Sequence, residues 1–125
     1  MSTSVEKKAA IVGIGETAVG IVPGKTARQL MIEAAKLAID DAGLSKNDID
    51  GIVTKVQVQN PWRGTIPGAD NSENESKAPY LAEYLGIRPD FALSQPTGGV
   101  NGGMMIFYAI GAISLGLAST VLIVT

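Results

Sequence analysis

The sequence predicts an α/β fold with a mostly parallel sheet and the element order βαβαβαβ. Short apolar runs rich in β-branched residues, at residues 9–14 and from residue 120 onward, are typical of strands that are buried on both faces. A late helix without a charged residue, at residues 102–117, is expected to be buried in the centre of the fold. Strands that alternate with helices require right-handed crossovers, so neighbouring strands should run parallel.

The first helix has the clearest boundaries. Thr26 and Gln29 form a capping box, and Gly43 is suited to the position just after the helix. We expect this helix to pack on the sheet through small apolar residues and to present its charged residues to water. The apolar stripe comprises Ala27, Met31, Ala34, Ala35, Ala38 and Ala42, and the charged face comprises Arg28, Glu33, Lys36 and Asp40.

The remaining elements follow from glycine and proline positions. Pro79 suits the first turn of a second helix, and Gly86 suits its end. A polar stretch with several prolines and glycines is too long for a plain connector, and long loops usually carry function or are disordered. The expected elements are a short turn or helix at 45–50, a strand at 51–56, the long loop at 57–76, a helix at 79–85 and a strand at 91–93.

Composition limits the chemistry that the chain can perform. The 125 residues suffice for one domain, and 46% apolar against 18% charged residues suggests surface that is buried by a partner or by further chain. Without Cys or His, the chain has no thiolate or imidazole to act as nucleophile or base, and no metal site is expected. A net charge of −2 argues against nucleic-acid binding, and the absence of an N-terminal signal segment favours the cytoplasm.

The segment from residue 102 to residue 124 is uncharged and long enough to cross a bilayer. A buried helix followed by a buried strand is the favoured interpretation. Gly116 interrupts the run before a β-branched stretch, and no Lys, Arg or Trp flanks it as an interfacial anchor. We therefore expect no membrane span.

The loop before this helix is the strongest candidate site. Gly98, Gly99, Gly102 and Gly103 allow a ligand to approach the backbone closely. Unpaired N–H groups at a helix N-terminus, together with the helix dipole, favour negative charge. The loop should lie at the carboxyl edge of the sheet, where open α/β folds bind ligands.

Two nucleotide-binding patterns compete with this site. Gly13, Gly15 and Ala18 match the spacing of a dinucleotide fingerprint, but the next helix begins too late, at Thr26, for its N-terminus to meet a pyrophosphate. Residues 20–26 resemble a P-loop that is one residue short and contains Pro23, which cannot donate an N–H. A P-loop NTPase remains an alternative that a nucleotide titration would test.

Aromatic residues supply two weaker signals. Trp62 and Arg63, in the long loop, could line a substrate site or anchor an interface. Tyr80 and Tyr84 lie one helical turn apart, which indicates one face docked against a neighbour.

Taken together, three stretches resemble the N-terminal part of the thiolase superfamily, and most closely its sterol-carrier and lipid-transfer branch. They are AAIVGIGET, TARQLMIEAAKLAIDDAGLSKNDIDGIVT and AIGAISLGLASTVLIVT. The resemblance implies a thiolase-like N-terminal half in which residues 1–125 form an incomplete domain, either a fragment of a larger dimeric protein or one piece of a split enzyme. It also implies a coenzyme A thioester as substrate, with no bound cofactor, and an accessory acyl-CoA-binding subunit as a possible partner.

The resemblance places the family's nucleophilic cysteine at Gly99 and a family glycine at Gly102. It therefore implies an enzyme without the thiolase nucleophile, similar to the aldolase-like members of the branch. The backbone at Gly99, Val100 and Gly102 is the expected oxyanion cradle, and the catalytic base is expected elsewhere. A non-catalytic lipid-binding or scaffold subunit is the alternative.

Overall fold

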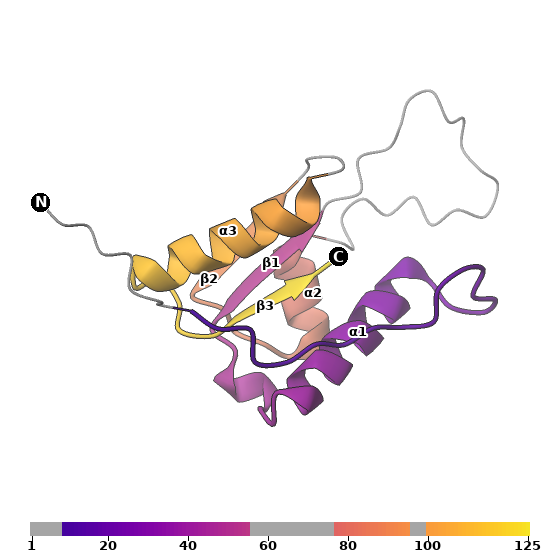
Figure 1. Cartoon of the computed structure of the whole chain (residues 1–125). Helices are drawn as coiled ribbons and strands as arrows, with labels where there is room; N and C mark the ends of the chain where they lie inside the picture. The colour runs from indigo at the N-terminus through magenta and orange to yellow at the C-terminus, as the bar shows by residue number, and fades with distance from the viewer. Residues whose placement is uncertain (1–8, 56–76, 96–99) are drawn as a thin grey trace, which may run out of the picture.

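The computed structural model describes residues 9–55, 77–95 and 100–125 (Figure 1). Three helices and three strands alternate along the chain, which confirms the predicted α/β class. The elements are α1 (Ala27–Asp41), a 3₁₀ turn (Lys46–Asp48), β1 (Gly51–Lys55), α2 (Ala78–Leu85), β2 (Phe91–Gln95), α3 (Asn101–Ser114) and β3 (Val121–Val124).

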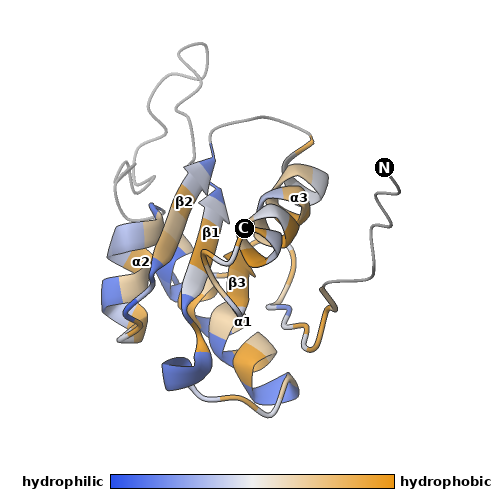
Figure 2. Ribbon diagram, turned by 90° about the vertical axis from the view of Figure 1, so that its left-hand side faces the viewer, coloured by the Kyte–Doolittle hydropathy of each residue, from blue (hydrophilic) through white to orange (hydrophobic). Residues whose placement is uncertain are grey.

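The sheet is parallel, with the strand order β2-β1-β3. Gly51 of β1 stands opposite Phe91 of β2 and Val121 of β3, so the three strands start level with one another. Helix α3 covers one face of the sheet, and α1 and α2 cover the other (Figure 2). All three carboxyl ends therefore lie at one edge of the sheet, beside the start of α3 (Figure 1).

Alternate residues of β1 contribute to two cores. Ile52 belongs to the cluster between the sheet and α1 with α2, together with Ile39 and Leu81. Val53 points to the opposite face, because successive strand residues alternate, and it lies on the side of α3. Both residues are fully buried, as a central parallel strand requires.

The caps of the helices are as predicted. The Thr26 hydroxyl accepts from the backbone N–H of Gln29 at 3.2 Å, and the Gln29 side chain accepts from the N–H of Thr26 at 2.8 Å. Gly43 follows α1 with a φ of +67°, and Gly86 ends α2 with a φ of +68°. Both are left-handed conformations that favour glycine at helix ends.

The prediction of a strand at residues 9–14 is wrong for the structure. Among the described residues this segment pairs with no strand. It lies along α1 instead, where the Ile14 N–H donates to the Asp41 carboxylate at 2.8 Å. Gly13 and Gly15 allow this approach, since a side chain at either would overlap the backbone of α1.

The predicted faces of α1 need two corrections. The buried residues of α1 are Ala35 and Ile39. Ile39 was not in the predicted apolar stripe, and Ala27, which was, is exposed. Arg28 does not simply face water. Its guanidinium lies 4.5 Å from the centre of the Tyr84 ring and donates to the Tyr84 hydroxyl at 2.9 Å, so that it joins α1 to α2. Tyr84 thus contacts α1, but Tyr80 and Tyr84 are 46% and 52% exposed, so the docking of both tyrosines on a neighbour stays a prediction.

Helix α3 is buried on one side only. Met105, Ala109 and Ala112 face the sheet, whereas Phe107 is 68% exposed. Ile106 and Ile110 are about two-fifths exposed on the same outer surface. The uncharged run that could have crossed a bilayer is divided between α3 and β3, and the described residues contain no helix that is long and apolar enough to span a membrane.

Candidate functional site

The candidate site is the mouth of α3 at the carboxyl edge of the sheet (Figure 1). Val100 is the N-cap residue, is 66% exposed, and provides no side-chain cap to the first amides of the helix. Gly98 and Gly99 lie outside the described residues. Of the three residues expected to form the oxyanion cradle, the structure therefore places Val100 and Gly102 together, in the first turn of α3.

Two glycines open this helix although its conformation does not require them. Neither Gly102 nor Gly103 has a positive φ, and a methyl group on either would meet no other atom of the described chain within 4 Å. Each glycine costs the helix about 0.5–1 kcal/mol relative to alanine. Packing within the described chain therefore does not account for either glycine.

Polar side chains from neighbouring strands stand beside this mouth. Lys55 and Gln95 end β1 and β2 and are direct partners in the register (Figure 2). Side chains two positions apart on a strand lie on the same face. Lys55 and Gln95 are two positions beyond Val53 and Leu93, which pair with each other, so both lie on the face that α3 covers, together with Val53. Gln95 is only 3% exposed. Neither Lys55 nor Gln95 was among the predicted site residues.

A second polar pair lies at the same edge on the opposite face. The Ser94 hydroxyl accepts from the N–H of Ala78 at 2.8 Å and so caps α2. Thr54, its neighbour in the register, is fully buried, and its hydroxyl has no hydrogen-bond partner among the described residues. Ser94 thus joins β2 to the start of α2.

The shifted carboxylates lie away from this mouth. Burial raises the pKa of Asp50, but hydrogen bonds from the N–H groups of Thr120 and Ser119 outweigh burial and hold that pKa below its ordinary value. Hydrogen bonds from the Ser45 backbone and hydroxyl likewise lower the pKa of Asp48. Asp50 precedes β1, at the amino end of the sheet. Asp50 is therefore a structural residue, at the opposite end of the sheet from the mouth of α3.

The nucleotide-binding alternatives receive no geometric support. The glycines of the dinucleotide-like pattern pack against α1, and the helix begins at Ala27 as expected. In the P-loop-like segment, Lys25 forms an ion pair with Glu33, and Thr26 is occupied as the helix cap. Both residues of that segment that would contact a phosphate already have partners within the chain.

Trp62 and Arg63 lie outside the described residues, so their proposed role in a substrate loop stays a prediction. The opening of the glycine loop into a pocket also stays a prediction, because Gly98 and Gly99 lie outside the described residues. A groove in the described part of the chain is lined by residues of α2, the following loop and β2, and by none of the predicted site residues.

Comparison with known proteins shows that the fold of this chain is similar to part of the fold of thiolase-like proteins. The chain matches an Ltp2-ChsH2(DUF35) aldolase structure with a TM-score of 0.66 and 31% identity over 87% of its residues, which is 25% of that chain. It matches a monomeric SCP2-thiolase-like protein of Mycobacterium smegmatis with a TM-score of 0.65 and 25% identity over 90% of its residues, which is 22% of that chain.

One relative found by sequence is named for a particular reaction. A steroid side-chain-cleaving aldolase of Thermomonospora curvata is 50% identical over 46 residues, 37% of this chain and 12% of that protein. No family model matches the chain. The chain thus resembles the SCP2-thiolase-like branch, including its aldolases, and spans about a quarter of the length of the structures it matches.

Proposed function

We propose that the chain is part of a thiolase-like enzyme that cleaves or forms a carbon–carbon bond β to a coenzyme A thioester by an aldol route. The observation that carries the proposal is the glycine-rich start of α3, without a cap from its N-cap side chain, in a chain that has no cysteine and whose fold is similar to thiolase-like proteins. The relatives named as aldolases, one of them for steroid side chains, support this reaction class and a lipid-like substrate. The longer protein, its dimer mate and an accessory acyl-CoA-binding subunit are the partners that the proposal implies.

The chemistry assigned to this chain is electrostatic. In a retro-aldol reaction, a base removes the proton of a β-hydroxyl group, the bond between the α and β carbons breaks, and a carbonyl product leaves. The electron pair moves onto the thioester as an enolate, which is protonated at the α carbon. Amide donors aimed at the enolate oxygen stabilise this charge, often the largest single catalytic contribution. Uncapped amides at the start of α3 are suited to that role.

The base is assigned to another part of the assembly, because the chain contains no His or Cys. The resemblance places the family's nucleophilic cysteine at Gly99, and this alignment is part of the proposal. Without a nucleophile, no acyl group is held covalently on this chain.

Free coenzyme A tests the reaction class. With the complete assembly and a β-hydroxyacyl-CoA substrate, we expect release of a carbonyl product and the shortened acyl-CoA at a rate that does not depend on added free coenzyme A. Mass spectrometry of both products over a series of coenzyme A concentrations measures this. A rate that rises with coenzyme A indicates thiolysis by a nucleophile from elsewhere, and no turnover by the complete assembly favours the scaffold alternative.

A glycine substitution at the mouth tests the site. We expect Gly102→Ala to raise the free energy of unfolding by about 0.5–1 kcal/mol, because alanine favours the helix and its methyl group meets no described atom. The same methyl group should lower kcat/KM at least tenfold by crowding the oxyanion. Gly111→Ala is the matched control, since Gly111 lies in the same helix with equally open surroundings. Equal activity in the two variants would remove Gly102 from the site.

A further inference from the structure

Lys55, the last residue of β1, is a half-buried cation. No ion pair or hydrogen bond joins its side chain to another described residue. Lys25, by contrast, is paired with Glu33, and Arg28 lies on the Tyr84 ring. Removing water from a charged group costs free energy unless an opposite charge replaces the water. The half-buried ammonium group of Lys55 is therefore suited to a bound anion.

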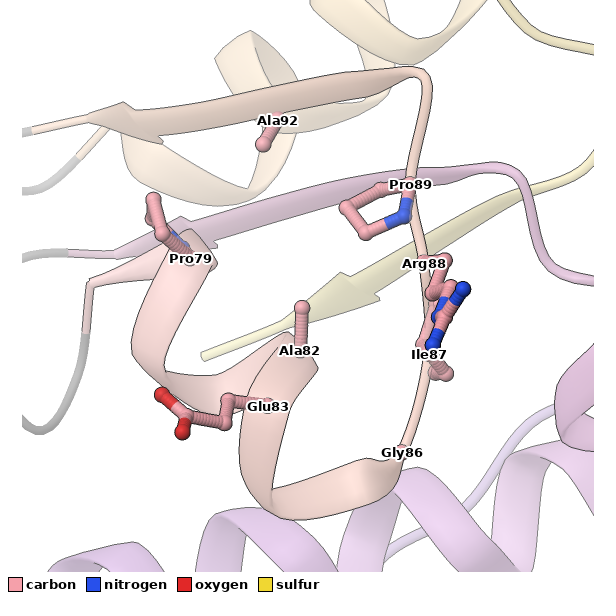
Figure 3. A pocket seen from close by; sticks show the side chains of 8 residues that line it. All are labelled: Pro79, Ala82, Glu83, Gly86, Ile87, Arg88, Pro89 and Ala92. Carbon is pink, nitrogen blue, oxygen red and sulfur yellow. The ribbon is translucent and has the colours of Figure 1, made fainter.

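Arg88 is a poorer candidate for an anion site. It borders a groove of about 660 Å³ whose walls come from α2, the following loop and β2 (Figure 3). Glu83 extends from α2 at the same groove, so an anion there would meet charges of both signs. The groove therefore does not compete with the carboxyl edge of the sheet as a place for negative charge.

Two sources of positive potential meet at that edge. Lys55 lies on the face of the sheet that α3 covers, and the carboxyl ends of the strands lie beside the start of α3 (Figure 1). The N-cap residue Val100 gives the first amides of α3 no side-chain cap. None of the described acidic residues lies in β1, β2, β3 or α3. An anion near the start of α3 is therefore attracted by the ammonium group and by the helix dipole together.

We propose that Lys55 is a further catalytic residue of the aldol reaction, and that its ammonium group binds the enolate oxygen together with the amides at the start of α3. This inference rests on the proposed function. When the bond between the α and β carbons breaks, its electron pair moves onto the thioester, whose oxygen becomes negative. Lys55 keeps its proton and donates a hydrogen bond to that oxygen, and the α carbon takes its proton from another group.

This role predicts a preference for charge. A hydrogen bond from an ammonium group to a negative oxygen is about twice as strong as one between neutral groups. Lys55 should therefore stabilise the enolate more than the neutral thioester, and only such differential binding accelerates the reaction.

Two coenzyme A thioethers test this preference in the complete assembly. One carries a nitroalkane, whose ionised nitronate has the charge and planar shape of the enolate, and the other carries a neutral methyl ketone. Lys55→Met should weaken nitronate binding at least tenfold and ketone binding less than threefold, because it removes the charge and keeps the length of the side chain. Lys55→Arg, which keeps the charge, should retain most of the preference. Lys36→Met, at an exposed residue of α1, is the matched control and should change neither affinity.

Titration calorimetry measures both affinities, with circular dichroism to verify folding. Reductive methylation of the unaltered assembly needs no substitution: the nitronate, but not the ketone, should protect Lys55, and neither should protect Lys36. Equal weakening of the two analogues by Lys55→Met would indicate a structural role, and unchanged binding with no protection would place Lys55 outside the site. Either result would overturn the proposal.

Turnover separates this proposal from the proposed function. Lys55→Met should lower kcat for a β-hydroxyacyl-CoA at least tenfold and leave KM within threefold, because the lost contact forms only as charge develops. An unaltered assembly that cleaves no β-hydroxyacyl-CoA would reject the aldol reaction. The preference for nitronate over ketone would still decide whether Lys55 binds an enolate-like oxygen.

Discussion

Asp50→Ala should destabilise the fold by about 2 kcal/mol, the size expected when a charged acceptor of amide hydrogen bonds is removed. The Asp50 carboxylate accepts from the N–H of Ser119 at 2.9 Å and from the N–H of Thr120 at 2.8 Å. Its backbone carbonyl accepts from Asp90 at 2.7 Å and from Phe91 at 3.2 Å. One residue therefore fixes the starts of all three strands, and its side chain holds the turn that leads into β3.

The contribution of Asp50 also depends on pH. The amides of Thr120 and Ser119 outweigh burial and lower the pKa of Asp50 in the folded chain. A lowered folded pKa means that the stabilisation is fully present above the unfolded pKa, about 4, and is lost as the pH falls through the folded pKa. The difference in stability between the parent and Asp50→Ala should therefore be large at pH 7 and shrink below pH 4.

Urea unfolding at pH 7 and pH 3 measures this difference. Asp50→Asn, which keeps the shape and one acceptor oxygen, should lie between the parent and the alanine variant. Asp48→Ala is the matched control, because Asp48 binds only the backbone and hydroxyl of the nearby Ser45 and joins no strands. It should cost less than Asp50→Ala. Equal losses at the two positions would show that the link between the strands adds nothing.

Local signals in the sequence were sufficient for most of the fold. The capping box at Thr26, the glycines that end α1 and α2, and the proline in the first turn of α2 act within a few residues, so they fix element boundaries without knowledge of the tertiary structure. Residues 9–14 show where such signals fail. Their apolar pattern is that of a strand, but in the structure this segment packs along α1, through Gly13 and Gly15 and through the Ile14 N–H bond to Asp41. These contacts join residues far apart in the sequence and have no local signal.

The candidate site could be predicted only in part, because only some of its signals are local in the sequence. A glycine-rich start to an uncapped helix can be read locally, which is why Val100 and Gly102 were found. Lys55 and Gln95 are 40 positions apart in the sequence and meet only through the register of two parallel strands. Ile39 was missed similarly, because its burial depends on the cluster that α2 completes.

The outer face of α3 should prevent the isolated chain from behaving as a stable monomer. An uncharged helix needs cover on all sides, and here the sheet covers only the side of Met105, Ala109 and Ala112. The outer face comprises Ile106, Phe107 and Ile110, and the adjoining turn adds Leu115 at 76% exposed and Leu117. A monomer rarely tolerates a contiguous apolar patch beyond a few hundred Å².

We therefore expect the isolated 125-residue chain to self-associate and to bind a hydrophobic dye. The double substitution Phe107→Ser and Ile110→Ser should reduce dye binding severalfold and shift the chain toward a monomer. Size-exclusion chromatography with light scattering measures the mass of the species that each chain forms. A sharp monomer peak from the unaltered chain, with cooperative thermal unfolding, would show that the outer face of α3 needs no cover.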